Sequence, residues 1–164
     1  MSANGSLVEQ VKATIYKACL LLDDQKWNEW LELCDDDFEY AIKAYSPEIQ
    51  RDMTYLSSSR TELATLTELL PKHNTDHSPL RRHCTVYSVE VDEANNTATA
   101  ITSLAVYQNM LDGVNSHVDA GEPHLFLIGR YIDKLRIDGP QAKFIGREVR
   151  LDTRRLDKGS HWPI

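Results

Sequence analysis

The chain has 164 residues, of which 41% are hydrophobic and 26% are charged, and its formal net charge is −7. This length suits one domain over residues 1–164 with a single core, and the acidic balance argues against a nucleic-acid partner, which would require a basic face. No apolar run approaches the roughly 20 residues that span a bilayer, and the first residues do not resemble a signal peptide, so we expect a cytoplasmic protein without a membrane partner.

The first part of the chain has the periodicity of helices. A capping-box pattern, Ser6-x-x-Glu9, precedes apolar residues at helical spacing and predicts a helix that starts near Ser6. A second, shorter helix is expected to begin at Asp23 or Asp24 and to end at the acidic residues 35–37.

A strand and a third helix are predicted next. Residues 38–45, FEYAIKAY, alternate in the manner of a strand, with Tyr40 on the more apolar face. Ser59-x-x-Glu62 is a second capping box, and we expect the helix that it starts to end at Pro71. The chain up to this point is therefore mainly helical.

The second part of the chain has the pattern of long strands separated by turn residues. Strands are expected over residues 80–92, 97–110, 123–137 and 142–153. Helices followed by a meander of strands predict an α+β fold, in which N-terminal helices pack on a strongly curved, mostly antiparallel sheet. Because strands of a dozen residues twist and curl, we expect a cone-shaped sheet with an internal cavity.

Potential metal ligands occur in two places, and neither has the spacing of a metal site. The first group is His73, His77, His83 and Cys84, and the second is His117, Asp119 and His124. Zinc sites use compact, stereotyped ligand spacing, and the consecutive residues His83 and Cys84 point to opposite faces of a strand. The three cysteines form no CxxC pair, which indicates reduced thiols. We therefore expect no metal or other cofactor in this chain.

His83 is the main candidate for acid–base chemistry. If the strand alternates regularly from Arg82, His83 shares a face with Tyr87 and points into the cavity of the cone, where Tyr40 or Asp133 would complete an acid–base pair. The alternative is that His83 forms a hydrogen bond near the sheet rim or contacts another subunit. The sequence contains no GxSxG nucleophile motif and no glycine-rich nucleotide-binding motif.

Five short patterns, taken in order, resemble the small (beta) subunit of Rieske-type aromatic-ring-hydroxylating oxygenases. They are W-x-x-W-L-x-L-x-x-D-D-F-E-Y from Trp27 to Tyr40, the strand entry Arg82-His83, the strand SLAVYQNM, the strand Gly129-Arg130-x-x-Asp133-x-Leu135-Arg136, and the run from Lys143-Phe144-Ile145 to Arg147. Each pattern alone is weak, but the order adds specificity, and the resemblance covers nearly the whole chain.

The resemblance implies a nuclear-transport-factor-like, cystatin-like cone fold and a chain without catalytic residues. It implies that the Rieske 2Fe–2S cluster and the mononuclear Fe(II) belong to a large (alpha) subunit, and that NADH supplies electrons through a reductase. It also implies an assembly of three alpha and three beta chains, in which the beta chains self-associate as a trimer. The substrate would be an aromatic compound or another small organic molecule, such as a sulfonate.

On this reading, the polar segment that leads into the strand at residue 80 contacts neighbouring subunits. The expected interface residues are Arg81, Arg82, His83, Arg130, Asp133, Arg147 and Trp162. The alternative hypothesis is a stand-alone dehydratase, isomerase or hydrolase of the same fold, or a small-ligand binding module. For that alternative the cavity residues would be Tyr40, His83, Tyr87 and Asp133.

Overall fold

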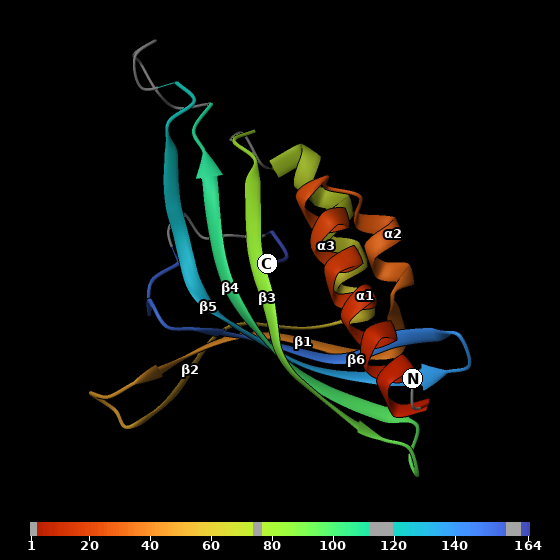
Figure 1. The fold of residues 1–164 in the computed structure, drawn as a ribbon. Coiled ribbons are helices and arrows are strands. Elements are labelled where there is room, and N and C mark those ends of the chain that lie inside the picture. The colour runs from red at the N-terminus through yellow and green to blue at the C-terminus, as the bar shows by residue number, and fades with distance from the viewer. Residues whose placement is uncertain (1–2, 74–76, 112–119, 157–161) are drawn as a thin grey trace.

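The computed structural model describes residues 3–73, 77–111, 120–156 and 162–164. One six-stranded sheet runs through the molecule, and the helices lie against one of its faces (Figure 1). The helices are α1 (Ala3–Asp23), α2 (Trp27–Glu32) and α3 (Arg60–His73), and the strands are β1 (Cys34–Ser46), β2 (Arg51–Ser59), β3 (Leu80–Asp92), β4 (Thr97–Asn109), β5 (Pro123–Asp138) and β6 (Gln141–Leu151). The predicted α+β class is confirmed. Within the described ranges, none of the helices combines the length and apolarity of a bilayer-spanning segment.

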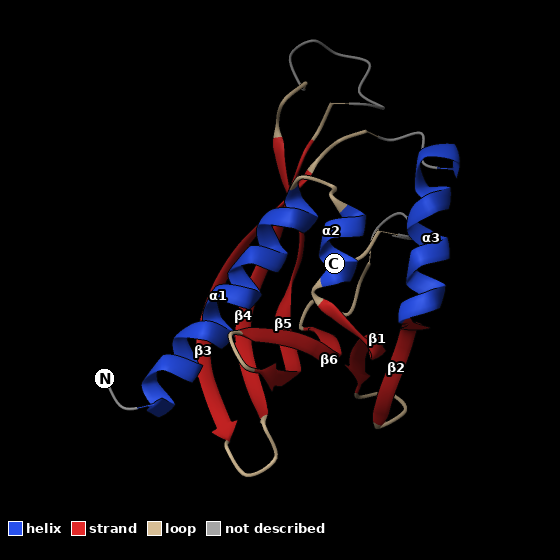
Figure 2. Ribbon diagram, turned by 90° about the vertical axis from the view of Figure 1, so that its right-hand side faces the viewer, coloured by secondary structure: helices blue, strands red, loops and turns tan. Residues whose placement is uncertain are grey.

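The strand order in the sheet is β2-β1-β6-β5-β4-β3. Neighbours from β3 to β6 pair antiparallel, as does β1 with β2, but β1 and β6 are parallel. The mostly antiparallel sheet was expected, whereas the parallel pair was not. The pairing register shifts in every one of these ladders, and such bulges bend and twist the sheet around the helices (Figure 2).

The predicted strands of the second part agree with β3 to β6 within about two residues. Strand β2 was not expected. It lies at the sheet edge and buries only Ser58, so its sequence lacks the apolar alternation that reveals a half-buried strand. The acidic residues 35–37, expected to end a helix, belong to β1.

Two predicted helix starts are wrong. Helix α1 begins at Ala3, so Ser6 lies inside the helix and is not at its N-terminal boundary. Helix α2 begins at Trp27, because Asp23 still belongs to α1 and Asp24 continues it with a backbone hydrogen bond to Leu20.

Ser59 caps the start of α3 as expected, but the Glu62 carboxylate meets the Ser59 hydroxyl and not the backbone N–H of a full capping box. The Glu62 backbone N–H donates a hydrogen bond to Ser59 Oγ over 3.2 Å, and the Ser59 hydroxyl donates to Glu62 Oε1 over 3.3 Å. The helix continues two residues beyond Pro71, to His73. A proline in the last turn removes only one hydrogen bond, which a short remaining segment tolerates.

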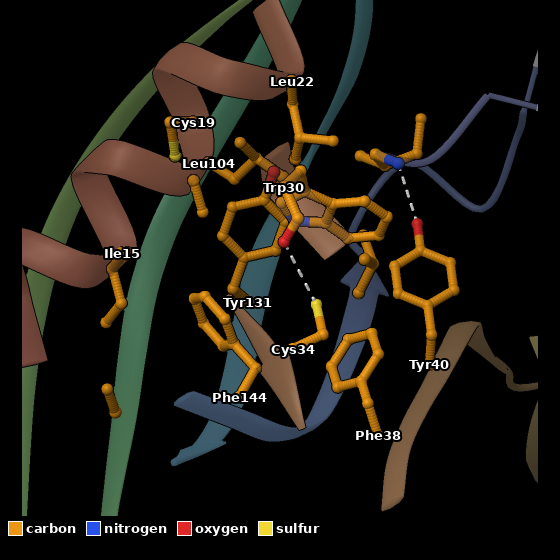
Figure 3. Close-up of a cluster of buried hydrophobic side chains, with 14 of the residues drawn as sticks. Ile15, Cys19, Leu22, Trp30, Cys34, Phe38, Tyr40, Leu104, Tyr131 and Phe144 are labelled. Atoms are coloured by element: carbon orange, nitrogen blue, oxygen red, sulfur yellow. Dashed lines mark hydrogen bonds between the residues drawn. The ribbon is translucent and has the colours of Figure 1, made fainter. Parts of the chain in front are cut away.

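Large side chains fill the space between the helices and the sheet (Figure 3). Helix α1 buries one face against the sheet, including Val11, Ile15 and Leu22. The ring of Trp30 on α2 packs edge-on against Phe38 and Tyr40 of β1, with centroid distances of 6.2 and 6.4 Å. The space expected to be a cavity thus contains an aromatic core.

Candidate functional site: the sheet interior and the open sheet face

The interior contains a two-point ion pair between strands β5 and β6. Arg147 Nε and Nη2 donate to the two carboxylate oxygens of Asp133 over 2.7 and 2.9 Å, and both side chains are almost completely buried. The guanidinium carbon of Arg147 also lies 3.7 Å from the ring centroid of Tyr131 and 4.6 Å from that of Phe144, which adds cation–π attraction.

The charges of this pair stabilise each other against burial. Burial raises the pKa of the Asp133 carboxyl and lowers that of the Arg147 guanidinium. The charge and the hydrogen bonds of Asp133 nevertheless raise the pKa of Arg147 above its ordinary value. A charge-assisted fork of this geometry favours the ionised forms of both groups. Asp133 then has both oxygens engaged inside this chain.

Arg82 is a second buried arginine, and it joins three parts of the molecule. Its Nη1 donates to Asp23 Oδ1 of α1 over 2.8 Å, and its backbone N–H donates to the same oxygen over 3.1 Å. Its Nη2 donates to the backbone carbonyl of Pro163 over 2.9 Å. Arg82 therefore fixes α1 and the segment 162–164 to the start of β3.

Tyr40 holds the same segment from the other side. Its hydroxyl accepts a hydrogen bond from the Ile164 backbone N–H over 2.8 Å, and both residues are buried (Figure 3). Burial raises the pKa of the Tyr40 phenol to about 12, so the group stays protonated at neutral pH. The nearby Trp162 packs edge-on against Trp27 at a centroid distance of 6.0 Å. Segment 162–164 thus packs against the interior.

His83 lies on the opposite side of the sheet. The register of β3 against β4 shifts between Val86 and Ser88, and this bulge changes which residues face the helices. Val86 and Val91 pack against the core, whereas His83 and Tyr87 are exposed. The expectation that His83 points into the interior of the cone is therefore wrong. The structure does not bring His83 or Tyr87 together with Tyr40 or Asp133.

The sheet surface that carries His83 is not covered by the helices. Cross-strand pairs connect it from β3 to β5: His83 is opposite Ala105, Ala105 is opposite Ile128, and Ile101 is opposite Ile132. The imidazole of His83 packs edge-on against the Tyr107 ring at 5.4 Å. We call this surface the open sheet face and define it by His83, Ile101, Ala105, Tyr107, Ile128 and Ile132.

Large apolar side chains of the open sheet face are exposed to solvent. Tyr107, Ile128 and Ile132 are 38, 40 and 36% exposed. Two exposed arginines lie at this face. Arg81 is opposite Tyr107, and Arg130 lies between Ile128 and Ile132 along β5. A contiguous apolar area of this kind, with cations at its margin, is typical of a protein–protein contact surface.

A groove of about 430 Å³ continues this surface toward β1 and β2. Its polar lining includes Glu39, Lys43, Lys134 and Glu148. Lys43 Nζ lies 3.4 Å from Glu148 Oε1, so two of the charges neutralise each other. The groove therefore offers a wide polar margin to the open sheet face.

The structure divides the predicted interface residues into two groups. Arg81, His83 and Arg130 are exposed on the uncovered side of the sheet and stay candidates for subunit contact. Arg82, Asp133 and Arg147 are buried and engaged within the chain, which leaves them almost no surface for another subunit, and Trp162 is half-buried against Trp27.

The sequence analysis missed two residues of the open sheet face. The apolar residues Ile128 and Ile132 were not selected, although β5 carries apolar residues on both of its faces, and that pattern was their signal.

The described residues contain no group of three or more His, Cys, Asp or Glu side chains placed to hold a metal ion. His117 and Asp119 lie outside the described residues, and the exposed His124 has Nε2 3.6 Å from Glu122 Oε2.

Residues 17–158 match the sequence model of the family described as ring hydroxylating beta subunit. The chain belongs to this family. The expected resemblance is confirmed, and the chain is a beta subunit of a hetero-oligomeric oxygenase with an alpha subunit as its partner.

Two curated relatives cover nearly the whole chain. The methanesulfonate monooxygenase hydroxylase subunit beta of Methylosulfonomonas methylovora is 59% identical over 156 residues, which are 95% of this chain and 86% of the relative. The 2-aminobenzenesulfonate 2,3-dioxygenase subunit beta of an Alcaligenes species is 31% identical over 150 residues, which are 92% of this chain and 94% of the relative.

Two solved structures show the same fold. A beta subunit assigned to an aromatic-ring-hydroxylating dioxygenase of Novosphingobium aromaticivorans superposes with a TM-score of 0.78 at 21% identity, over 99% of this chain and all of that one. An NTF2-like protein with a cystatin-like fold from the same species superposes with a TM-score of 0.61 at 17% identity, over 95% of this chain and 88% of that one. The predicted cone-type fold is confirmed.

Proposed function

We propose that this chain is the non-catalytic beta subunit of a Rieske non-haem iron oxygenase that hydroxylates a small alkanesulfonate. Both curated relatives carry names that include a sulfonate, methanesulfonate in one and 2-aminobenzenesulfonate in the other. The identity of 59% to the methanesulfonate protein, against 31% to the aromatic one, supports the smaller substrate and a monooxygenase.

The observation that supports the non-catalytic role is that Asp133 and Tyr40, the interior candidates, already form hydrogen bonds within the chain. A general acid or base must lie within hydrogen-bond reach of a proton on the substrate. Asp133 is held on both oxygens by Arg147, and the Tyr40 hydroxyl is held by the Ile164 backbone. The two remaining candidates, His83 and Tyr87, are exposed and lie outside the interior. The interior therefore supports a structural role.

The redox chemistry then belongs to the partner chains. The alpha subunit carries the Rieske 2Fe–2S cluster and the mononuclear Fe(II), and NADH supplies electrons through a reductase. Three alpha and three beta chains form the complex in the cytoplasm, with the beta chains in contact as a trimer. These features rest on the family resemblance and not on residues of this chain.

The open sheet face is the surface through which this chain contacts the other subunits. Buried interface centres are enriched in aromatic residues and arginine, and the open sheet face offers Tyr107 with Arg81 and Arg130 nearby. Its isoleucines add apolar area that a monomer would leave in water.

The test is co-expression of this chain with a candidate Rieske large subunit, followed by assays on the separated and assembled proteins. With NADH and a reductase supplied, we expect oxygen consumption in response to methanesulfonate from the assembled complex and not from the separated beta chain, and metal analysis to find the iron with the large subunit. Turnover by the isolated beta chain, or stoichiometric iron in it, would contradict the proposal.

A His83→Ala variant separates the structural role from the catalytic alternative. As an interface residue, His83 should affect the recovery of the complex while turnover per assembled complex changes little. Loss of a general acid or base lowers turnover by about a hundredfold or more. An intact complex with that loss would favour the catalytic alternative.

A further inference from the structure

Three contacts join helix α1 to strand β3 along one line. The Val86 backbone N–H donates to the Tyr16 hydroxyl over 3.1 Å, and Arg82 donates to Asp23 over 2.8 Å. Between them, the Sγ atoms of Cys19 and Cys84 lie 3.4 Å apart. Residues 16, 19 and 23 share one face of α1 because helical residues three and four apart are neighbours. The two outer contacts therefore hold the two sulfurs together.

The two thiols are placed to react with each other. A disulfide bond is about 2.05 Å long, so the sulfurs must approach by a little more than about 1 Å. Cys19 is 7% exposed, and its side chain lies among the buried residues in Figure 3, while Cys84 is partly exposed. A small oxidant can thus reach the pair from the Cys84 side.

The surroundings shift the pKa values of the two thiols in opposite directions. The hydrogen bond from Cys84 lowers the pKa of the Cys19 thiol, and the charges of Arg147 and Arg82 lower it further, although burial raises it. The same hydrogen bond, followed by burial, raises the pKa of Cys84. The thiolate is the reactive form of cysteine, and either sulfur can be the donor in the contact between the two.

Cys34 provides a comparison within the same chain. Its thiol donates to the backbone carbonyl of Trp30 over 3.6 Å, and burial raises its pKa to about 12. Cys34 has neither a sulfur neighbour at bonding range among the described contacts nor a lowered pKa, so it should react slowly.

We propose that Cys19 and Cys84 are a peroxide-reactive dithiol that closes to a disulfide between α1 and β3. The Cys19 thiolate attacks one oxygen of a hydroperoxide; an S–O bond forms, the O–O bond breaks, and the leaving hydroxide takes a proton. Cys84 then attacks the Cys19 sulfur; the S–S bond forms, the S–O bond breaks, and the second hydroxide leaves with the Cys84 proton as water. With hydrogen peroxide, two thiols give one disulfide and two waters.

The disulfide would connect positions 65 residues apart in the sequence. A cross-link over such a long loop restricts the unfolded chain, so the oxidised protein should unfold at a higher temperature or denaturant concentration than the reduced protein. The bond would join the helix to the strand whose other face carries His83, and it would rigidify the support of the open sheet face.

The test treats the purified full-length chain with hydrogen peroxide, blocks the remaining thiols with an alkylating reagent, and maps the cysteines by mass spectrometry. We expect a Cys19–Cys84 cross-linked peptide, with Cys34 still alkylated. A tenfold difference in thiolate population follows from one unit of pKa, so Cys19 should react more than about tenfold faster than Cys34. This measurement needs no variant and does not depend on the folding of one.

Three substitutions sharpen the result. Cys34→Ala should still form the disulfide, Cys19→Ala should lose the fast reaction, and Cys84→Ala should accumulate a sulfenic acid at Cys19 that dimedone traps. Cross-links between chains, preferential oxidation of Cys34, or an unreacted pair under conditions that oxidise free cysteine would each overturn the proposal.

Discussion

Asp133 and Arg147 face each other as residues of adjacent strands in the register of β5 and β6, and their side chains meet at two points inside the core. Both side chains are at most 1% exposed. A buried ion pair adds little net stability, because both ions lose their hydration, but removal of one partner leaves the other charge buried and uncompensated.

We therefore expect Arg147→Met to destabilise the chain by about 3–5 kcal/mol. Urea unfolding of the isolated subunit measures the change. Arg136→Met is the matched control, because Arg136 pairs with Asp35 at the exposed surface and such pairs contribute at most about 1 kcal/mol. Equal losses in the two variants would contradict the structural account of the interior pair.

Strand β5 has no room for a side chain at Gly129. A Cβ atom there would lie 2.2 Å from the backbone carbonyl oxygen of Arg150 on β6. Overpacking of this kind costs about 1–3 kcal/mol, and a backbone neighbour moves less readily than a side chain. We expect Gly129→Ala to lower the unfolding midpoint and the yield of folded protein.

Gly146 on β6 is the control for this substitution. Its nearest neighbour would be 3.9 Å from an added Cβ, which is ordinary contact. Gly146→Ala should be neutral or stabilise by about 0.4–1 kcal/mol, because alanine restricts the unfolded chain. A Gly129→Ala protein as stable as Gly146→Ala would show that β5 and β6 are not this close.

The Tyr40 hydroxyl is expected to fix segment 162–164. Tyr40→Phe removes the acceptor of the Ile164 N–H, and a buried polar group without its partner costs about 1–3 kcal/mol. Hydrogen exchange should show faster exchange at Ile164 in this variant. The exposed Tyr87→Phe should leave that exchange rate unchanged, and equal rates in all three proteins would refute the contact.

Sequence patterns were sufficient for the strands β3 to β6, because each has one face against the core and one toward solvent. Strand β2 was missed because an edge strand buries too little to alternate. The face of His83 was missed because a one-residue bulge reverses the alternation without a signal in the residue types. Arg82 and Arg147 were placed at an interface because charged residues are usually exposed, and only the fold reveals their buried partners, Asp23 and Asp133.

The open sheet face provides the last prediction. Ile132→Lys should weaken binding to the large subunit by at least about thirtyfold, which corresponds to a hot-spot loss of about 2 kcal/mol. The isolated variant should keep its fold, because Ile132 is already 36% exposed. Leu20→Lys on the exposed side of α1 is the control, and gel filtration with titration calorimetry measures both. A defect in Leu20→Lys with normal binding by Ile132→Lys would place the contact on the helices.

The parallel pairing of β1 with β6 also sets the order in which the molecule can fold during synthesis. Strand β1 is made early, but one of its two edges has no neighbour until residues 141–151 have left the ribosome. Pairing over more than a hundred residues is slow, and an open strand edge promotes aggregation in the meantime. The yield of folded protein should therefore rise when chaperones are co-expressed and when the chain is produced at a lower temperature.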